Sequence, residues 1–168
     1  VLSDRNGYIQ IYSSIGLLRP SGGKFLFPGK LVQDLHYKPL SDKKIAGMTI
    51  CLDQLIYLDD SAVLSNAWAG KIYVKHNMTG AKILKAGNDF TFLVSDGRKI
   101  IFLNDTEVLW ESEHSDKIKD IEFDNINNCF WILGEKMMSR FDPSVKTIES
   151  LLENSNVTCI AATKGKIY

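Results

Sequence analysis

Short apolar runs of four or five residues, each preceded by a turn rich in Asp, Asn or Gly, recur along this chain. The turns that mark them are Asp4–Gly7, Asp53–Gln54, Asp96–Lys99, Asn127–Asn128 and Lys164–Gly165. The first and last, at Gly7 and Gly165, lie 158 residues apart over four intervals, so the mean spacing is about 39.5 residues. A strand-rich unit that recurs every ~40 residues is typical of a β-propeller, whose blades are four-stranded sheets.

Within each unit the pattern favours strands, because apolar residues rarely recur at helical spacing and β-branched or aromatic residues alternate instead. Asp89–Val94 and Ile100–Leu103 predict a hairpin around the turn Ser95–Gly97. The third unit predicts a whole blade in chain order, with strands at Ile118–Phe123, Phe130–Leu133, Met137–Asp142 and Thr147–Leu151.

Two further segments complete the predicted organisation. Gly70–Val74 and Gly80–Leu84 read as the third and fourth strands of the preceding blade, and Val157–Ala162 with Ile167–Tyr168 reads as a hairpin. The pattern stops within a strand at Tyr168. We therefore expect an all-β propeller of about four blades over residues 1–168, a single domain or part of one, truncated at its C-terminus and belonging to a larger ring.

Composition and charge limit the kinds of partner that this chain is expected to bind. Hydrophobic residues make up 45% and charged residues 24% of the chain, which are ordinary globular values. Lys and Arg number 20, as do Asp and Glu, so the formal net charge is zero and no nucleic-acid partner is expected. No apolar run reaches the ~18 residues of a membrane helix, so this segment is not expected to insert into a membrane.

The cysteines and histidines indicate no metal or cofactor site. Three cysteines at wide spacing (Cys51, Cys129 and Cys159) form neither a disulfide framework nor a zinc pattern, and their apolar neighbours predict buried thiols. The histidines (His36, His76 and His114) each lack a second ligand at metal-binding spacing. The run Glu111–Asp116 around His114 predicts a solvated loop.

The sequence also gives little indication of catalytic or sugar-binding residues. Glycosidase chemistry needs two carboxyl groups ~5–10 Å apart across a cleft, and sequence neighbours on a strand point to opposite faces. The pairs Asp59–Asp60, Glu111 with Glu113, and Asp116 with Asp120 are therefore expected to serve turns and solubility, and no catalytic residue is assigned. Of the tryptophans that could stack on a sugar (Trp68, Trp110 and Trp131), Trp131 is expected to pack between blades and Trp68 to lie in a loop. The ligand-binding residues stay unknown.

Two of the units resemble a known repeat motif in addition to being regularly spaced. The segment Ser3–Arg19 resembles the motif D-x-x-G-x-I-W-I-G-T-x-x-G-L-x-R of the two-component regulator propeller repeats. Ile118–Asp142 resembles a second copy, and Val157–Tyr168 the opening half of a third. The motif's tryptophan is Gln10 in the first copy and is kept as Trp131 in the second. The resemblance covers less than half of the chain, and the region from Phe25 to Trp110 matches poorly. WD repeats fit less well, because their Gly-His and Trp-Asp landmarks are missing.

The resemblance implies a function. Such repeats build the periplasmic sensor regions of hybrid histidine kinases, so we expect a non-enzymatic, extracytoplasmic sensor module, periplasmic or extracellular in a bacterium. A carbohydrate or other small ligand is the expected partner, no cofactor is expected, and a homodimer would form through the parent protein, which would carry the histidine kinase domain. Ligand binding would act as a population shift between two arrangements.

Two alternatives from other classes stay open. A propeller glycoside hydrolase or lyase would need carboxylates converging at the ends of inner strands, and Asp89 and Asp120 are the candidates. A protein-interaction propeller would instead present an apolar or aromatic surface without a small concave pocket.

Overall fold

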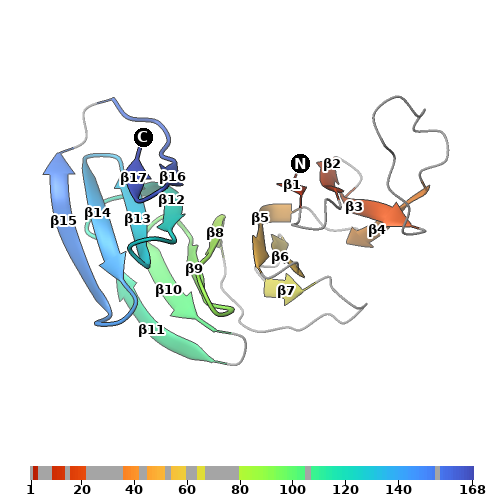
Figure 1. Ribbon diagram of the computed structural model, residues 1–168, viewed down its shortest axis with the longest axis horizontal. Coiled ribbons are helices and arrows are strands. Elements are labelled where there is room, and N and C mark those ends of the chain that lie inside the picture. The colour runs from red at the N-terminus through yellow and green to blue at the C-terminus, as the bar shows by residue number, and fades with distance from the viewer. Residues whose placement is uncertain are drawn as a thin grey trace.

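The computed structural model describes residues 2–3, 9–13, 16–21, 36–41, 45–51, 54–59, 64–66, 80–104, 107–153 and 156–168. The elements within these ranges are all strands, arranged in antiparallel sheets. Figure 1 shows the three- and four-stranded sheets following one another in chain order, from β3 (Gly16–Ser21) and β4 (His36–Ser41) at one end to β15 (Thr147–Glu153) at the other.

The predicted third-unit blade is confirmed. Its strands are β12 (Ile118–Asp124), β13 (Cys129–Gly134), β14 (Met137–Asp142) and β15 (Thr147–Glu153). They form one sheet in the order β12-β13-β14-β15, so each strand pairs with its neighbour in the chain. The turn between β12 and β13 is closed by Asn128 at φ 49°, in the left-handed region that Asn tolerates better than most residues.

The preceding blade is confirmed as a sheet, with two corrections. Its strands are β8 (Ile83–Ala86), β9 (Phe92–Ser95), β10 (Lys99–Leu103) and β11 (Val108–Glu113). Ile83–Ala86 therefore opens this blade, and the prediction that Gly80–Leu84 closes the blade before it is wrong. The predicted partner Gly70–Val74 lies outside the described residues.

The second correction concerns Asp89–Val94. Its strand starts only at Phe92, because Asp89 and Phe90 have φ of 52° and 57° and form the turn between β8 and β9. This turn is the counterpart of Asn127–Asn128, whereas the turn at Asp96–Lys99 joins the second and third strands of its blade. One of the five turns used to find the repeat was therefore out of phase. The mean spacing is unchanged, because the first and last turns define it.

The remaining sheets continue the pattern. A four-stranded sheet contains β1 (Leu2–Ser3), β2 (Ile9–Ser13), β3 (Gly16–Ser21) and β4 (His36–Ser41). A three-stranded sheet contains β5 (Ile45–Cys51), β6 (Gln54–Asp59) and β7 (Leu64–Asn66). A hairpin of β16 (Ala162–Thr163) and β17 (Lys166–Ile167) follows β15. It confirms the predicted turn at Lys164–Gly165, where both residues have positive φ. Its strands are shorter than predicted, since residues 157–161 are not in a strand.

First strands of successive blades lie side by side, which is the arrangement of a propeller. The sheets contact through β5 with β8, β8 with β12, and β12 with β16. Residues 37 and 40 positions apart meet there: Lys85 binds Glu122, and the backbone N–H of Ile160 donates to Asp120. The sequence period of about 39.5 residues thus corresponds to one step between blades.

The core lies between blades. In β9 and β10 successive side chains point to opposite faces, and both faces are covered. One face packs against the β5–β7 sheet through Phe92, Val94, Ile101 and Leu103, and the other packs against the β12–β15 sheet through Leu93, Ile100 and Phe102. A strand buried on both faces reads as a continuous apolar run, which explains Phe92–Val94 and Ile100–Leu103 in the sequence.

Candidate functional site

The loop between β11 and β12, residues 114–117, holds the most buried polar side chains that the structure describes outside the strands. The exposed fractions of His114 and Asp116 are 5% and 7%. The predicted solvated loop is therefore wrong: Glu111–Glu113 belong to β11, and His114 and Asp116 turn inward. The sequence did not indicate this burial, because it depends on the turn between β13 and β14, which lies some 20 residues further along the chain.

Asp116 binds backbone N–H groups through both carboxylate oxygens. Oδ1 accepts from Lys117 at 2.8 Å, and Oδ2 accepts from Met137 at 3.1 Å and from Lys136. Burial alone would raise the pKa of this carboxyl, but the N–H donors of Lys136, Lys117 and Met137 outweigh burial and hold the pKa below its usual value. The carboxylate is a structural acceptor that fixes the turn between β13 and β14.

His114, Ser139 and Asp116 come together in a way that invites comparison with a Ser-His-Asp triad. Nε2 of His114 lies 3.2 Å from Oγ of Ser139, and Nδ1 lies 2.9 Å from the backbone oxygen of Asp116. In a triad the acid's carboxylate would hold that Nδ1, and the serine would be open to substrate. Here the carboxylate binds backbone amides instead, and Ser139 is 0% exposed. The cluster therefore supports the fold and does not form a nucleophile.

The structure separates Asp89 and Asp120, the carboxylates considered for an enzyme. Asp120 accepts from the backbone N–H of Ile121 at 2.9 Å and of Ile160 at 3.1 Å, one at each oxygen. Asp89 lies exposed in the turn that ends β8. The ion pair between Lys85 of β8 and Glu122 of β12 shows which positions of the two strands lie side by side. Asp120 comes two residues before Glu122, near the start of β12, whereas Asp89 comes four residues after Lys85, beyond the end of β8. The two groups therefore do not converge.

The other carboxylates considered as pairs have separate partners where the structure describes them. Glu111 binds Lys99 of the neighbouring strand at 3.0 Å, on the exposed outer strand β11. Asp116 and Asp120 each bind backbone amides, as described above. Asp59 ends β6, and its predicted partner Asp60 lies outside the described residues. Asp116 and Asp120 therefore fix backbone geometry, and Glu111 links two strands at the surface.

Polar contacts join the first strands of neighbouring blades and the turns after them, and the sequence did not predict these contacts. Lys85 and Glu122 form an ion pair at 2.6 Å, with side chains 30% and 22% exposed. At the strand ends the side-chain amide of Asn88 donates to Oδ1 of Asn128 at 2.9 Å. Both contacts join residues one blade apart, so a comparison of positions 37–40 residues apart would have found them. These contacts present polar groups along the edge where successive blades meet.

The tryptophans and cysteines have mostly structural positions. Trp110 stacks on Phe141 with ring centres 4.8 Å apart, which joins two blades. Trp131 is half-buried on the face of β13 opposite to Phe130, and Trp68 lies outside the described residues. Cys51 and Cys129 are buried as predicted, and burial raises the pKa of both thiols. Cys159 is exposed, so the prediction of burial is wrong for that residue.

The lowered pKa values of three carboxyl groups predict how the stability of the protein changes at low pH. Like Asp116, Asp124 has a pKa below its usual value, because bonds from Asn127 and Ile126 outweigh burial, and Asp142 has a lowered pKa chiefly through Ser144. The unfolded chain therefore binds more protons than the folded one at low pH. The stability that these groups contribute is complete above the usual carboxyl range, about pH 4, and is lost as the pH falls through their folded values.

We expect the urea midpoint to fall steeply below about pH 4, and we expect Asp116→Asn to lower stability at pH 7 while flattening this pH dependence. Urea unfolding at pH 7, 5, 4 and 3 measures both. An unchanged slope in the variant would contradict the assignment of Asp116 as a contributor.

In the part of the chain that the structure describes, no three His, Cys, Asp or Glu side chains are placed to share a metal ion. No helix there has the length and hydropathy of a membrane span.

Solved structures share this fold. The chain is similar to the extracellular domain of a protein from B. thetaiotaomicron, described in one structure as a one component system and in another as a hybrid two component system. The TM-scores are 0.62 and 0.61, at 15% identity, over 93% and 95% of this chain and 22% of the other. The WD40 domain of Neurospora crassa Pan2 has a TM-score of 0.59 at 13% identity, over 90% of this chain and 48% of the other.

These similarities confirm the predicted propeller fold. The chain spans about a fifth of the length of the B. thetaiotaomicron domain. That domain is described as extracellular, and at 15% identity its similarity to this chain concerns the fold. No protein-family model and no curated protein matches the chain.

Proposed function

We propose that this chain is part of the extracytoplasmic sensor region of a two-component signalling protein and that it binds a carbohydrate or a related small ligand. The observation that carries the proposal is the agreement between two independent signs. The motif at Ser3–Arg19 and Ile118–Asp142 resembles regulator propeller repeats, and the fold is shared with an extracellular domain of a signalling protein at a TM-score of 0.62.

The described blades supply the scaffold for such a role. Asp116 and Asp120 bind backbone amides, Glu111 binds a lysine, and the Ser139–His114 pair is buried, which supports binding over hydrolysis. We further propose that the blades belong to a larger ring. In support, β16 lies against β12 as β12 lies against β8, and its hairpin has the turn geometry of the opening of a blade.

A thermal-shift titration with oligosaccharides released from several polysaccharides tests the proposal. A ligand at 100 times its Kd stabilises the folded state by about 2.7 kcal/mol, which for a domain of this size raises Tm by roughly 5–10 °C. We expect one glycan class to do so, and chromatography of the mixture to show the glycan intact. Cleaved products would favour the glycoside hydrolase or lyase alternative. No shift with any glycan, at saturating concentration, would contradict carbohydrate binding.

A further inference from the structure

The loop 114–117 is bonded to turns of two different blades. Toward the preceding blade, the backbone N–H of His114 donates to the oxygen of Arg98 at 2.8 Å. Directly after the loop, the N–H of Ile118, the first residue of β12, donates to the oxygen of Gly97 at 2.7 Å. Toward its own blade, the N–H of Glu135 donates to the oxygen of Lys117 at 2.9 Å, beside the Asp116 bonds already described. The loop therefore joins the β9–β10 turn to the β13–β14 turn.

Each of these turns is held by a carboxylate that accepts hydrogen bonds from its backbone. In the β9–β10 turn, Oδ1 of Asp96 accepts from the N–H groups of Arg98 and Lys99, both at 2.8 Å. Oγ of the fully buried Ser95 accepts from the N–H of Gly97 at 3.0 Å. In the β13–β14 turn the corresponding acceptor is Asp116, which comes from the loop and not from the turn. The second turn thus depends on the loop for its shape.

The loop has little freedom to move without both turns. If it shifted away from the β13–β14 turn, the buried Asp116 carboxylate would lose the donors Lys136 and Met137 and keep only Lys117 of the loop itself. A buried charge that lacks hydrogen-bond partners is unfavourable. If it shifted away from the β9–β10 turn, two backbone bonds of 2.7 and 2.8 Å would break. The buried His114 adds a contact from the loop to β14, since its Nε2 lies 3.2 Å from Oγ of Ser139.

We propose that loop 114–117 couples the β9–β10 turn to the β13–β14 turn, so that a displacement of one turn is transmitted to the other. Both turns join second to third strands, so they lie on the same rim of the propeller. A ligand or partner that contacts either turn then changes the relative position of two blades. This coupling concerns the blades themselves and does not depend on the identity of the ligand.

Amide hydrogen exchange of the full chain, followed by NMR, tests the coupling. Asp96→Ala loosens only the β9–β10 turn directly. We expect it to speed exchange at the Lys136 and Met137 amides, in the other turn, by about tenfold, as for a local opening. The core amides of Phe130 and Ile132 are expected to keep their rates. In an Asp116→Asn background the same Asp96→Ala change is expected to have no further effect on Lys136 and Met137.

Asp142→Ala is the matched control, because Asp142 accepts from the N–H of Ser144 in a turn on the opposite rim. It is expected to leave Lys136 and Met137 unchanged. The proposal is overturned if Asp96→Ala speeds exchange at Arg98 and Lys99 but not at Lys136 and Met137, or if Asp142→Ala has the same effect as Asp96→Ala. Should Asp96→Ala fail to fold, Asp96→Asn retains one side-chain oxygen and gives the same comparison with a smaller displacement.

Discussion

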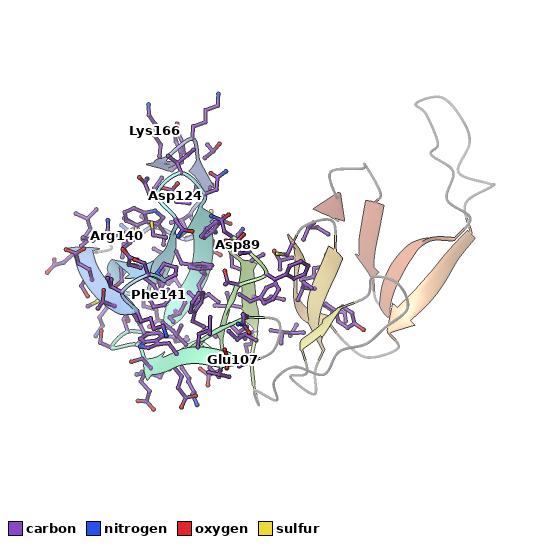
Figure 2. The ribbon with its side chains drawn as sticks, turned by 60° about the horizontal axis from the view of Figure 1, so that its bottom comes forward. Asp89, Glu107, Asp124, Arg140, Phe141 and Lys166 are labelled. Carbon is purple, nitrogen blue, oxygen red and sulfur yellow. The ribbon has the colours of Figure 1, made fainter. Side chains whose placement is uncertain are left out.

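Replacing Phe130 by alanine is expected to lower the free energy of unfolding by about 3–5 kcal/mol. Phe130 is 0% exposed, and its ring lies 4.8 Å from that of Phe123 and 6.2 Å from those of Phe102 and Phe141. Phe141 lies among the packed side chains between the two blades (Figure 2). Truncation removes apolar contacts on both sides of this interface and leaves a cavity that rigid strands cannot close.

Urea unfolding, followed by tryptophan fluorescence, measures this loss. Because 3–5 kcal/mol is a large part of the stability of an ordinary domain, Phe130→Leu serves as a milder companion that keeps most of the volume. Val145→Ala, at a turn residue that is 64% exposed, is the control and is expected to change stability by less than about 0.5 kcal/mol. A loss below about 1 kcal/mol for Phe130→Ala would show that the interface is not packed as described.

The second large effect is expected at Gly134, the last residue of β13. A Cβ added there would collide with the carboxylate of Asp116 and lie 3.0 Å from the backbone oxygen of Met137. The main chain cannot yield without disturbing the hydrogen bonds that Asp116 accepts from the β13–β14 turn. We expect Gly134→Ala to lower the free energy of unfolding by about 1–3 kcal/mol through overpacking.

A double-mutant cycle separates this clash from other effects of the substitution. Asp116→Ala removes the carboxylate, and with it the main obstacle to the new methyl group. Gly134→Ala is therefore expected to cost clearly less in the Asp116→Ala background than in the wild type, as measured by urea unfolding. Strict additivity of the two losses would show that the carboxylate is not what limits residue 134.

The β12–β15 blade could be predicted from the sequence, because its turns and strands depend on residues that are close together in the chain. The turn at Asn127–Asn128 and the strand lengths around it follow from the backbone preferences of nearby residues, so the β12–β15 blade was predicted strand by strand. The turn at Asp89–Phe90 was missed because Phe90, unlike Asp89, is a residue that rarely adopts positive φ. Packing of Phe90 against the core overrides this preference, and the neighbouring Asp96–Gly97 turn matched the expected pattern better.

Contacts between blades were not predictable in the same way. Lys85 and Glu122 lie on different strands that meet only when two blades stack, and nothing near either residue indicates an ion pair. His114 and Asp116 lie in a run of charged residues that is typical of an exposed loop. Their burial results from the β13–β14 turn, whose unpaired N–H groups need an acceptor.

The sequence by itself determined the repeat length, the strand-rich class and the order of strands within a blade, because these depend on turn residues and apolar runs a few positions apart. Only the tertiary structure decided which face of each strand is covered, which charged groups are buried, and that loop 114–117 joins two blades. Those features depend on residues some 20 to 40 positions apart, brought together when one sheet packs against the next.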